Sequence, residues 1–213
     1  VTQAELYNPD FIPGIENGAA LIAKTGIGFD SSAESNEKVS RLAEEAAITG
    51  VYVSYEKDLR TDTNRRTFEI NTAGTQGYAG FDGKAVELED VSFNLDNDYA
   101  TAVLTSLDPN SAIRSSEKLL LTATARTRNT DSLLSDEGTY LKNAGTAPIL
   151  VEPVRGTITL KTKDTYDVYA LSSSGERKEK LLVTTLENGA QQFDIGAEST
   201  MYYELVKTND VAD

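Results

Sequence analysis

The chain has 213 residues, of which 39% are hydrophobic, so it can build one large domain with a small appendage but is short for two independent globular domains. Its 34 acidic and 20 basic side chains give a formal net charge of −14, which repels nucleic acid and anionic membrane surfaces. Because it has no Cys and no His, it lacks disulfides, thiolate nucleophiles, imidazole bases and Cys/His zinc sites. An enzyme of this composition would rely on carboxylates, as glycosidases do.

No apolar run is long enough to span a bilayer, and the amino terminus lacks the basic and apolar regions of a signal peptide. We therefore expect no membrane insertion. The chain is expected to be a piece of a longer secreted or cell-surface protein.

The first 50 residues are predicted to form an irregular segment with one helix. Turn signals dominate residues 1 to 34, and Ser31 with Glu34 has the spacing of a capping box. Apolar residues then recur at helical spacing from Asn36 to Ala47, until Gly50 ends the pattern. The helix is amphipathic, and we expect its Ala-rich face to pack on a sheet.

From residue 51 to residue 208 the sequence predicts about a dozen short strands. Alternating or β-branched segments of strand length are Val51–Tyr55, Thr67–Asn71, Ala85–Leu88, Val91–Leu95, Tyr99–Leu107, Lys118–Arg126, Gly145–Val154, Gly156–Leu160, Tyr166–Leu171, Leu181–Leu186, Gln191–Ile195 and Met201–Val206. No helices alternate with them, which favours an antiparallel β-sandwich, jelly-roll-like in topology.

Short turn signals separate several of these strands. Asp82-Gly83 and Asn188-Gly189 each have the form of a two-residue hairpin turn, and Ser172 to Glu176 closes a third hairpin. The segment Gly74 to Gly77 predicts a bulge or a tight bend. A phosphate-binding loop is excluded there because no helix follows it.

The segments "LLLTATARTRNT", "GTAPILVEPVRGTITL" and "YDVYALSSSGER", and more loosely "FEINTAGTQGYAGFDGK", resemble a β-sandwich domain of modular bacterial glycoside hydrolases. That domain usually follows the catalytic (β/α)-barrel. The resemblance covers roughly the last three quarters of the chain and implies an accessory domain, which either binds glycan or buttresses the enzyme.

Tyrosines supply the first candidate binding site, since the chain has ten Tyr, six Phe and no Trp. A sugar ring can stack on an aromatic plane while polar side chains bond its hydroxyls. Alternation places Tyr202 and Glu204 outward on the last strand and Tyr203 inward. Tyr166 and Tyr169 come from another late strand, on which both faces carry apolar residues, so their directions stay open. The alternative is that these tyrosines are core or rim packing.

The long segment from Thr127 to Ala144 is a second candidate, because connections of this length are often functional. Arg128, Asn129 and Tyr140 offer hydrogen-bonding groups and a stacking face for a glycan. Two alternatives are a solvated loop that covers a sheet edge and a contact with the preceding catalytic barrel, beside which this loop lies in the domains that the chain resembles.

Acidic turns raise the possibility of a structural calcium ion. Asp96 and Asp98 follow a strand closely, and Asp131, Asp136 and Glu137 form another set, although neither matches an EF-hand loop. Asp and Asn are also frequent in turns for local hydrogen-bonding reasons.

The sequence thus predicts an all-β antiparallel sandwich with a short amino-terminal helical and irregular appendage. We expect a non-catalytic carbohydrate-binding module that targets an attached glycoside hydrolase to polysaccharide, with no cofactor beyond a possible structural calcium. Its partners would be polysaccharide or oligosaccharide and the catalytic domain, not nucleic acid. The alternatives are a structural domain that buttresses a catalytic barrel and a carboxylate-dependent glycosidase or lyase.

Overall fold

The computed structural model describes residues 18–24, 37–81 and 83–208. The chain divides into two compact units, Val1–Arg66 and Thr67–Asp213, and each is described by itself. The expected boundary lay at residue 50. The first unit extends further because Tyr52 packs against its helices.

The first unit contains α2 (Ala19–Ile22), α3 (Glu37–Thr49) and an antiparallel hairpin of β1 (Val51–Val53) and β2 (Leu59–Asp62). Buried apolar side chains of the two helices form its core: Ala19, Ile22, Ala43 and Ala46. The partly buried Val39, Leu42 and Tyr52 pack against them. Gly50 ends α3 with φ 71°, a left-handed conformation that favours glycine.

The structure confirms the predicted helix, and the proposed capping box at Ser31 and Glu34 lies outside the described residues. Among the described helices, none has the length and apolar character needed to cross a bilayer.

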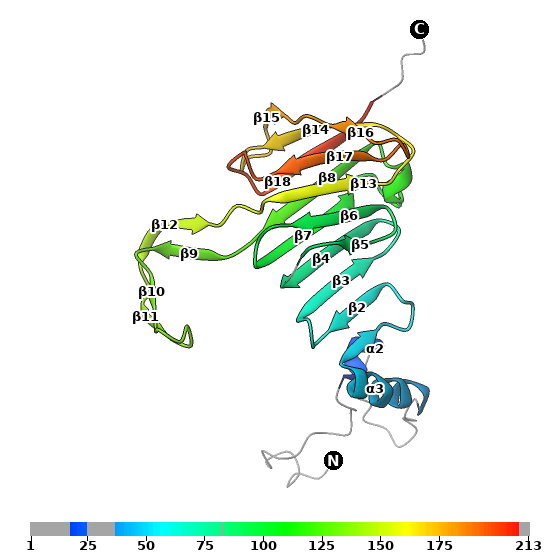
Figure 1. Ribbon diagram of the computed structural model, residues 1–213, viewed down its shortest axis with the longest axis vertical. Helices are drawn as coiled ribbons and strands as arrows, with labels where there is room; N and C mark the ends of the chain where they lie inside the picture. Colours follow the sequence, from blue (N-terminus) through cyan, green and yellow to red (C-terminus); the bar gives the residue numbers. More distant parts are fainter. Residues whose placement is uncertain (1–17, 25–36, 82, 209–213) are drawn as a thin grey trace. The chain divides into compact units, whose positions relative to one another are not determined.

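The second unit is all-β, and Figure 1 shows its strands in two layers. The larger sheet has the antiparallel order β3-β4-β7-β8-β18-β14-β15 within this unit. Its strands are β3 (Thr67–Asn71), β4 (Thr75–Phe81), β7 (Tyr99–Ser106), β8 (Lys118–Thr124), β18 (Tyr202–Lys207), β14 (Tyr166–Leu171) and β15 (Arg177–Lys180).

The smaller sheet has the order β16-β17-β13-β6-β5 and is also antiparallel. Its strands are β16 (Thr184–Thr185), β17 (Gln191–Ile195), β13 (Gly156–Leu160), β6 (Val91–Leu95) and β5 (Val86–Glu87). A short 3-10 helix, η1 (Ile113–Ser115), precedes β8.

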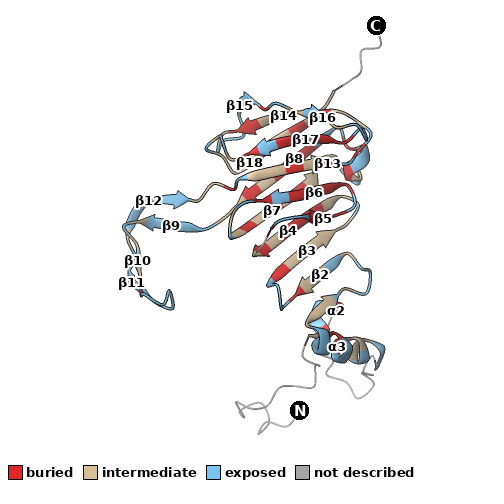
Figure 2. Ribbon diagram, in the orientation of Figure 1, coloured by how far each residue is buried: buried red, intermediate tan, exposed pale blue. Residues whose placement is uncertain are grey.

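The hydrophobic core of the second unit lies between the two sheets. The central strands of both sheets send alternate side chains into it, as the buried positions in Figure 2 show. Leu104, Leu121 and Leu205 come from the larger sheet, and Phe93 and Ile158 from the smaller one. This arrangement confirms the predicted sandwich.

Two buried glutamines connect the strands of one sheet with residues of the other. Gln76 of β4 donates from Nε2 to Asp90 Oδ2 (3.0 Å), and its Oε1 accepts from Asp90 N (2.7 Å). Asp90 lies just before β6 of the smaller sheet. Gln191 of β17 makes the equivalent reciprocal pair with the backbone N–H (2.7 Å) and carbonyl (3.3 Å) of Tyr166 in β14. Both polar side chains are therefore satisfied inside the core.

The long segment between β8 and β13 is not a plain loop. It forms two antiparallel ladders, β9 (Thr127–Thr130) with β12 (Thr146–Val151) and β10 (Leu133–Leu134) with β11 (Leu141–Asn143). We call residues 127–151 the arm. Its apolar side chains are largely exposed, as Ile149 (66%) and Leu150 (55%) illustrate. Figure 1 shows its ladders apart from the strands of the two large sheets.

The predicted turns had different outcomes. Asn188-Gly189 joins β16 to β17, and Ser172 to Glu176 joins β14 to β15, as expected. Gly74 lies in the tight turn between β3 and β4, where Thr72 N bonds Thr75 O. Asp82 lies outside the described residues, but the strands on either side do not form the predicted hairpin, because β4 pairs within the larger sheet and β5 pairs with β6 in the smaller one.

Candidate functional site

The outer face of the larger sheet, opposite the core, carries the first group of predicted site residues. Tyr203 is buried (1%) and its hydroxyl accepts from Gly196 N (3.2 Å), so Tyr202 points outward as predicted. Tyr202 stands directly opposite Thr122 of β8, and its neighbour Glu204 stands opposite Tyr169 of β14. The structure thus brings Tyr202, Glu204 and Tyr169 onto one face.

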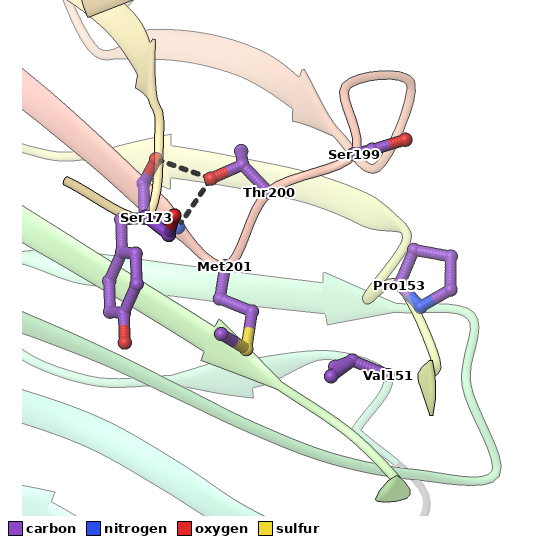
Figure 3. A pocket seen from close by; sticks show the side chains of 7 residues that line it. Val151, Pro153, Ser173, Ser199, Thr200 and Met201 are labelled. Atoms are coloured by element: carbon purple, nitrogen blue, oxygen red, sulfur yellow. Dashed lines mark hydrogen bonds between the residues drawn. The ribbon is translucent and has the colours of Figure 1, made fainter. Parts of the chain in front are cut away.

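Tyr202 borders a pocket of about 240 Å³ at the start of β18. Met201, Val151 and Pro153 supply its apolar lining, and Figure 3 shows these side chains around the pocket. Three hydroxyls, of Ser173, Ser199 and Thr200, complete the lining. These residues come from the β14–β15 turn, the turn before β18 and the segment that leaves the arm.

The hydroxyl groups of this pocket differ in whether they have hydrogen-bond partners within the protein. Thr200 Oγ1 donates to Leu171 O (2.5 Å) and accepts from Tyr202 N (3.1 Å), so it shapes the turn. Within the described part of the chain, the side-chain hydroxyls of Tyr202, Ser173 and Ser199 have no hydrogen-bond partner. An apolar wall with a few free hydroxyls is the usual composition of a small-molecule site.

Tyr169 and Glu204 are engaged in a charged cluster instead. The Arg177 guanidinium stacks 4.4 Å from the Tyr169 ring centroid and donates from Nε to Glu204 Oε2 (2.7 Å). Lys180 Nζ lies 2.8 Å from Asp167 Oδ2, on the same face. The hydrogen bond to Glu204 raises the pKa of Arg177, and the one to Asp167 raises the pKa of Lys180.

This cluster corrects the expectation for two predicted residues. One face of the Tyr169 ring is covered by Arg177, and the Glu204 carboxylate is held in an ion pair. Both side chains are therefore engaged within the protein, and neither lines the Tyr202 pocket.

Tyr166 is not a surface residue, which corrects the sequence-based expectation. Only 2% of it is exposed, and its hydroxyl donates to Ser116 O (2.7 Å). Burial raises the pKa of Tyr166 to about 12, and the nearby charge of Asp164 adds to this effect. Tyr166 therefore shares the inward face with Val168 and Ala170.

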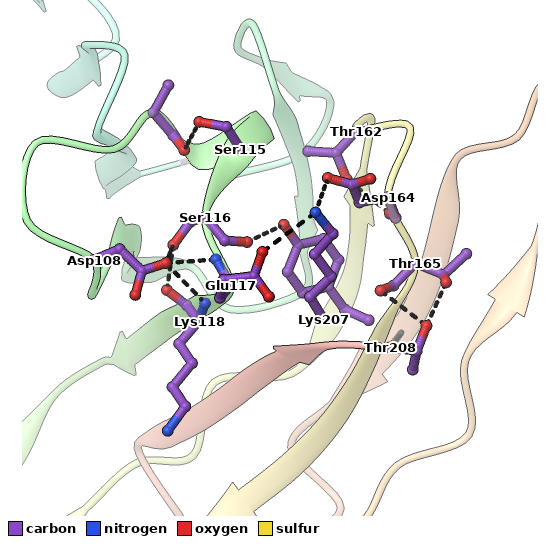
Figure 4. Close-up of polar contacts among 12 residues, drawn as sticks. Asp108, Ser115, Ser116, Glu117, Lys118, Thr162, Asp164, Thr165, Lys207 and Thr208 are labelled. Carbon is purple, nitrogen blue, oxygen red and sulfur yellow. Dashed lines mark hydrogen bonds and ion pairs between the residues drawn. The ribbon is translucent and has the colours of Figure 1, made fainter. Parts of the chain in front are cut away.

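The loops near Tyr166 are joined by a network of hydrogen bonds and ion pairs (Figure 4). Asp108 Oδ2 accepts from the Ser116 hydroxyl (2.9 Å), Glu117 N (2.5 Å) and Lys118 N (3.3 Å). The bond from Ser116 is the largest of the contributions that lower the Asp108 pKa. Lys207 Nζ lies 2.9 Å from Asp164 Oδ2. We assign this network to stability, because its hydrogen bonds tie the loops to β8 and β18.

The arm carries the remaining predicted contacts, Arg128, Asn129 and Tyr140. Asn129 Nδ2 donates to Ala144 O (2.9 Å), which ties the arm to itself. Arg128 and Asn129 line a separate groove of about 340 Å³, and Tyr140 is 62% exposed beside β11. None of these three residues lines the Tyr202 pocket, which contains only Val151 from the arm, so the two groups of predicted contacts do not share this pocket.

Asp96 and Asp98 do not form a recognisable calcium cage. Asp98 Oδ2 lies 3.9 Å from Arg126 Nη2, and the Asp98 side chain is 88% exposed. Asn97 between them ties two segments together, because its Oδ1 accepts from Arg155 N (2.8 Å) and its Nδ2 donates to Pro153 O (3.0 Å). Within the described ranges, no group of three or more His, Cys, Asp or Glu residues is placed to hold a metal ion.

Comparisons with known proteins add no further constraint. A scan against protein-family models, a search of curated proteins and a search of solved structures each found no match to this chain.

Proposed function

We propose that this chain is a non-catalytic carbohydrate-binding module, which keeps an attached glycoside hydrolase near polysaccharide by raising its effective concentration. The observation that carries the proposal is the pocket beside Tyr202. It combines an aromatic ring, the apolar side chains of Met201 and Pro153, and the free hydroxyls of Ser173 and Ser199. Those groups match the apolar ring faces and the hydroxyls of a sugar.

The binding role of Tyr202 is tested by replacing it with alanine. We expect Tyr202→Ala to weaken polysaccharide binding by roughly 5- to 150-fold, because losing one stacking aromatic costs about 1–3 kcal/mol at an interface. Its melting temperature should stay near that of the wild type, since Tyr202 faces outward from the sheet. Affinity electrophoresis in gels that contain soluble polysaccharides measures the change.

Tyr140→Ala is the matched control. Tyr140 is equally aromatic and more exposed, but it lies on the arm outside the pocket. The variant should be retarded in the gel like the wild type. The proposal is wrong if no polysaccharide retards the wild-type chain, or if Tyr202→Ala binds as the wild type does.

The arm favours a second candidate function, a structural domain that buttresses a catalytic barrel. Its apolar residues include Leu133 (56%), Leu141 (56%), Ile149 (66%) and Leu150 (55%), all exposed. Exposed apolar groups of this kind suit a protein contact. Deletion of the chain from its parent enzyme separates the two functions. A targeting module is needed only on insoluble polymer, whereas a buttress is needed for stability and for activity on soluble substrate.

A further inference from the structure

Strand register extends the Tyr202 pocket into a continuous row across the outer face of the larger sheet. Tyr202 stands opposite Thr122, Thr122 opposite Val103, Val103 opposite Gly77, and Gly77 opposite Ile70. All five have the parity of the outer face; Tyr202, Thr122, Val103 and Ile70 are half-buried, and Gly77 is buried. We call this row the track. Its four steps between neighbouring strands span about 19 Å, so it is long enough to contact several units of a polymer.

At the centre of the track, Gly77 has no side chain to project from the sheet. A Cβ at Gly77 would lie 2.9 Å from Val103 Cγ2, so the glycine leaves room for Val103 to lie across β4. Gly77 does not have a positive φ, and its backbone conformation therefore does not require glycine. A glycine inside a strand often marks close approach of another group.

Uncharged side chains surround the track on three strands, and the exposed Lys118 lies on the same face at the start of β8. The outward positions of Thr75–Phe81, Tyr99–Thr105 and Leu120–Thr124 are threonines, apolar or aromatic residues and Gly77. Phe81 and Tyr99 pack against each other on this face, with ring centroids 5.3 Å apart. Beyond Tyr202, two ion pairs join β14, β15 and β18: Arg177 with Glu204 and Lys180 with Asp167.

We infer that the track binds a single chain of an uncharged polysaccharide laid across the strands, starting at the Tyr202 pocket; the inference rests on the proposed function. The threonine hydroxyls can exchange hydrogen bonds with sugar hydroxyls, and Val103 and Ile70 can contact the apolar ring faces. A polyuronate or a sulfated glycan is disfavoured, because the track has no cation to meet its charges and the whole chain carries −14.

Substrate charge is tested with polymers that share a backbone. Hydroxyethyl cellulose and carboxymethyl cellulose differ in charge, and glucomannan and alginate widen the comparison. In affinity gels of moderate salt, at least one neutral polymer should retard the wild-type chain, and neither acidic polymer should. Equal retardation by an acidic polymer overturns the assignment of the substrate class.

The location is tested by placing a long charged side chain in the track. Thr122→Lys should weaken binding to the neutral polymer by about tenfold or more, because the lysine obstructs the row. Ile70→Lys, at the far end, gives an independent second variant. Ser92→Lys is the charge-matched control, since Ser92 faces outward on β6 of the smaller sheet and should bind as the wild type does. Melting curves show which variants are folded.

The outcomes separate this inference from the proposed function. If Tyr202→Ala loses binding while folded Thr122→Lys and Ile70→Lys retain it, the module binds sugar at the pocket alone, and the track is wrong. If the wild-type chain is retarded by no polymer, both the track and the proposed function are wrong.

Discussion

Replacing Gln76 with leucine is expected to lower the free energy of unfolding by about 2–4 kcal/mol. Leucine fills most of the same volume but removes both hydrogen bonds to Asp90. The Asp90 side chain is only 7% exposed, so its N–H and part of its carboxylate would be left without partners in the core. The ion pair with Arg114, at 3.3 Å, offsets some of this cost. Urea denaturation at neutral pH measures the difference.

Gln192→Leu is the matched control for this substitution. Gln192 is the half-buried neighbour of Gln191 on β17, and its Nε2 donates to Thr159 Oγ1 (3.2 Å) near solvent. Water can replace that bond, and the expected loss is below about 1 kcal/mol. A similar loss for the two variants would show that the Gln76–Asp90 pair does not connect the sheets as we describe.

The stability of the protein should fall as the pH rises above about 10, and Tyr166 should account for part of the fall. Its pKa is raised from 10.0 in the unfolded chain to about 12 in the folded state. A raised folded-state pKa gives stability that is fully present below the unfolded pKa and is lost as the pH rises toward the folded one. For Tyr166 the loss is about 1 kcal/mol by pH 11.

Tyr166→Phe isolates this contribution from that of other groups that titrate at high pH. The variant should be less stable at pH 7, by about 1 kcal/mol, because the hydrogen bond to Ser116 O is removed. Between about pH 9 and pH 11 it should lose less stability than the wild type does. Parallel pH profiles of the two proteins would mean that Tyr166 ionises as readily in the folded state as in the unfolded chain.

Local patterns in the sequence predicted most of the sandwich. Period-two alternation identified β6, β17 and β18 and placed Tyr202 outward and Tyr203 inward, because one face of each strand is buried and the other is not. Alternation could not orient Tyr166, because β14 has a nearly buried residue on both faces at its end, Ala170 (0%) and Leu171 (8%).

These local patterns could not predict which distant strands pair with one another. Asp82-Gly83 has the composition of a hairpin turn, yet the strands on either side join different sheets, a choice that depends on pairing with distant strands. The pocket could not be predicted for the same reason, because its lining residues Val151, Ser173 and Ser199 are far apart in the sequence. In the arm, β12 lies within the predicted strand Gly145–Val154. The strands β9, β10 and β11 were missed because nearly all of their residues are exposed and show no periodicity.

The central claim is that the outer face beside Tyr202 binds an uncharged polysaccharide, and chemical-shift mapping tests it most directly. A ¹⁵N-labelled chain is titrated with an oligosaccharide made from the neutral polymer that retards it in gels. We expect the largest shifts at the amides of Tyr202, Thr122 and Val103, which follow one another across β18, β8 and β7. Largest shifts within the arm, at residues 127–151, or no shifts at all, would contradict the claim.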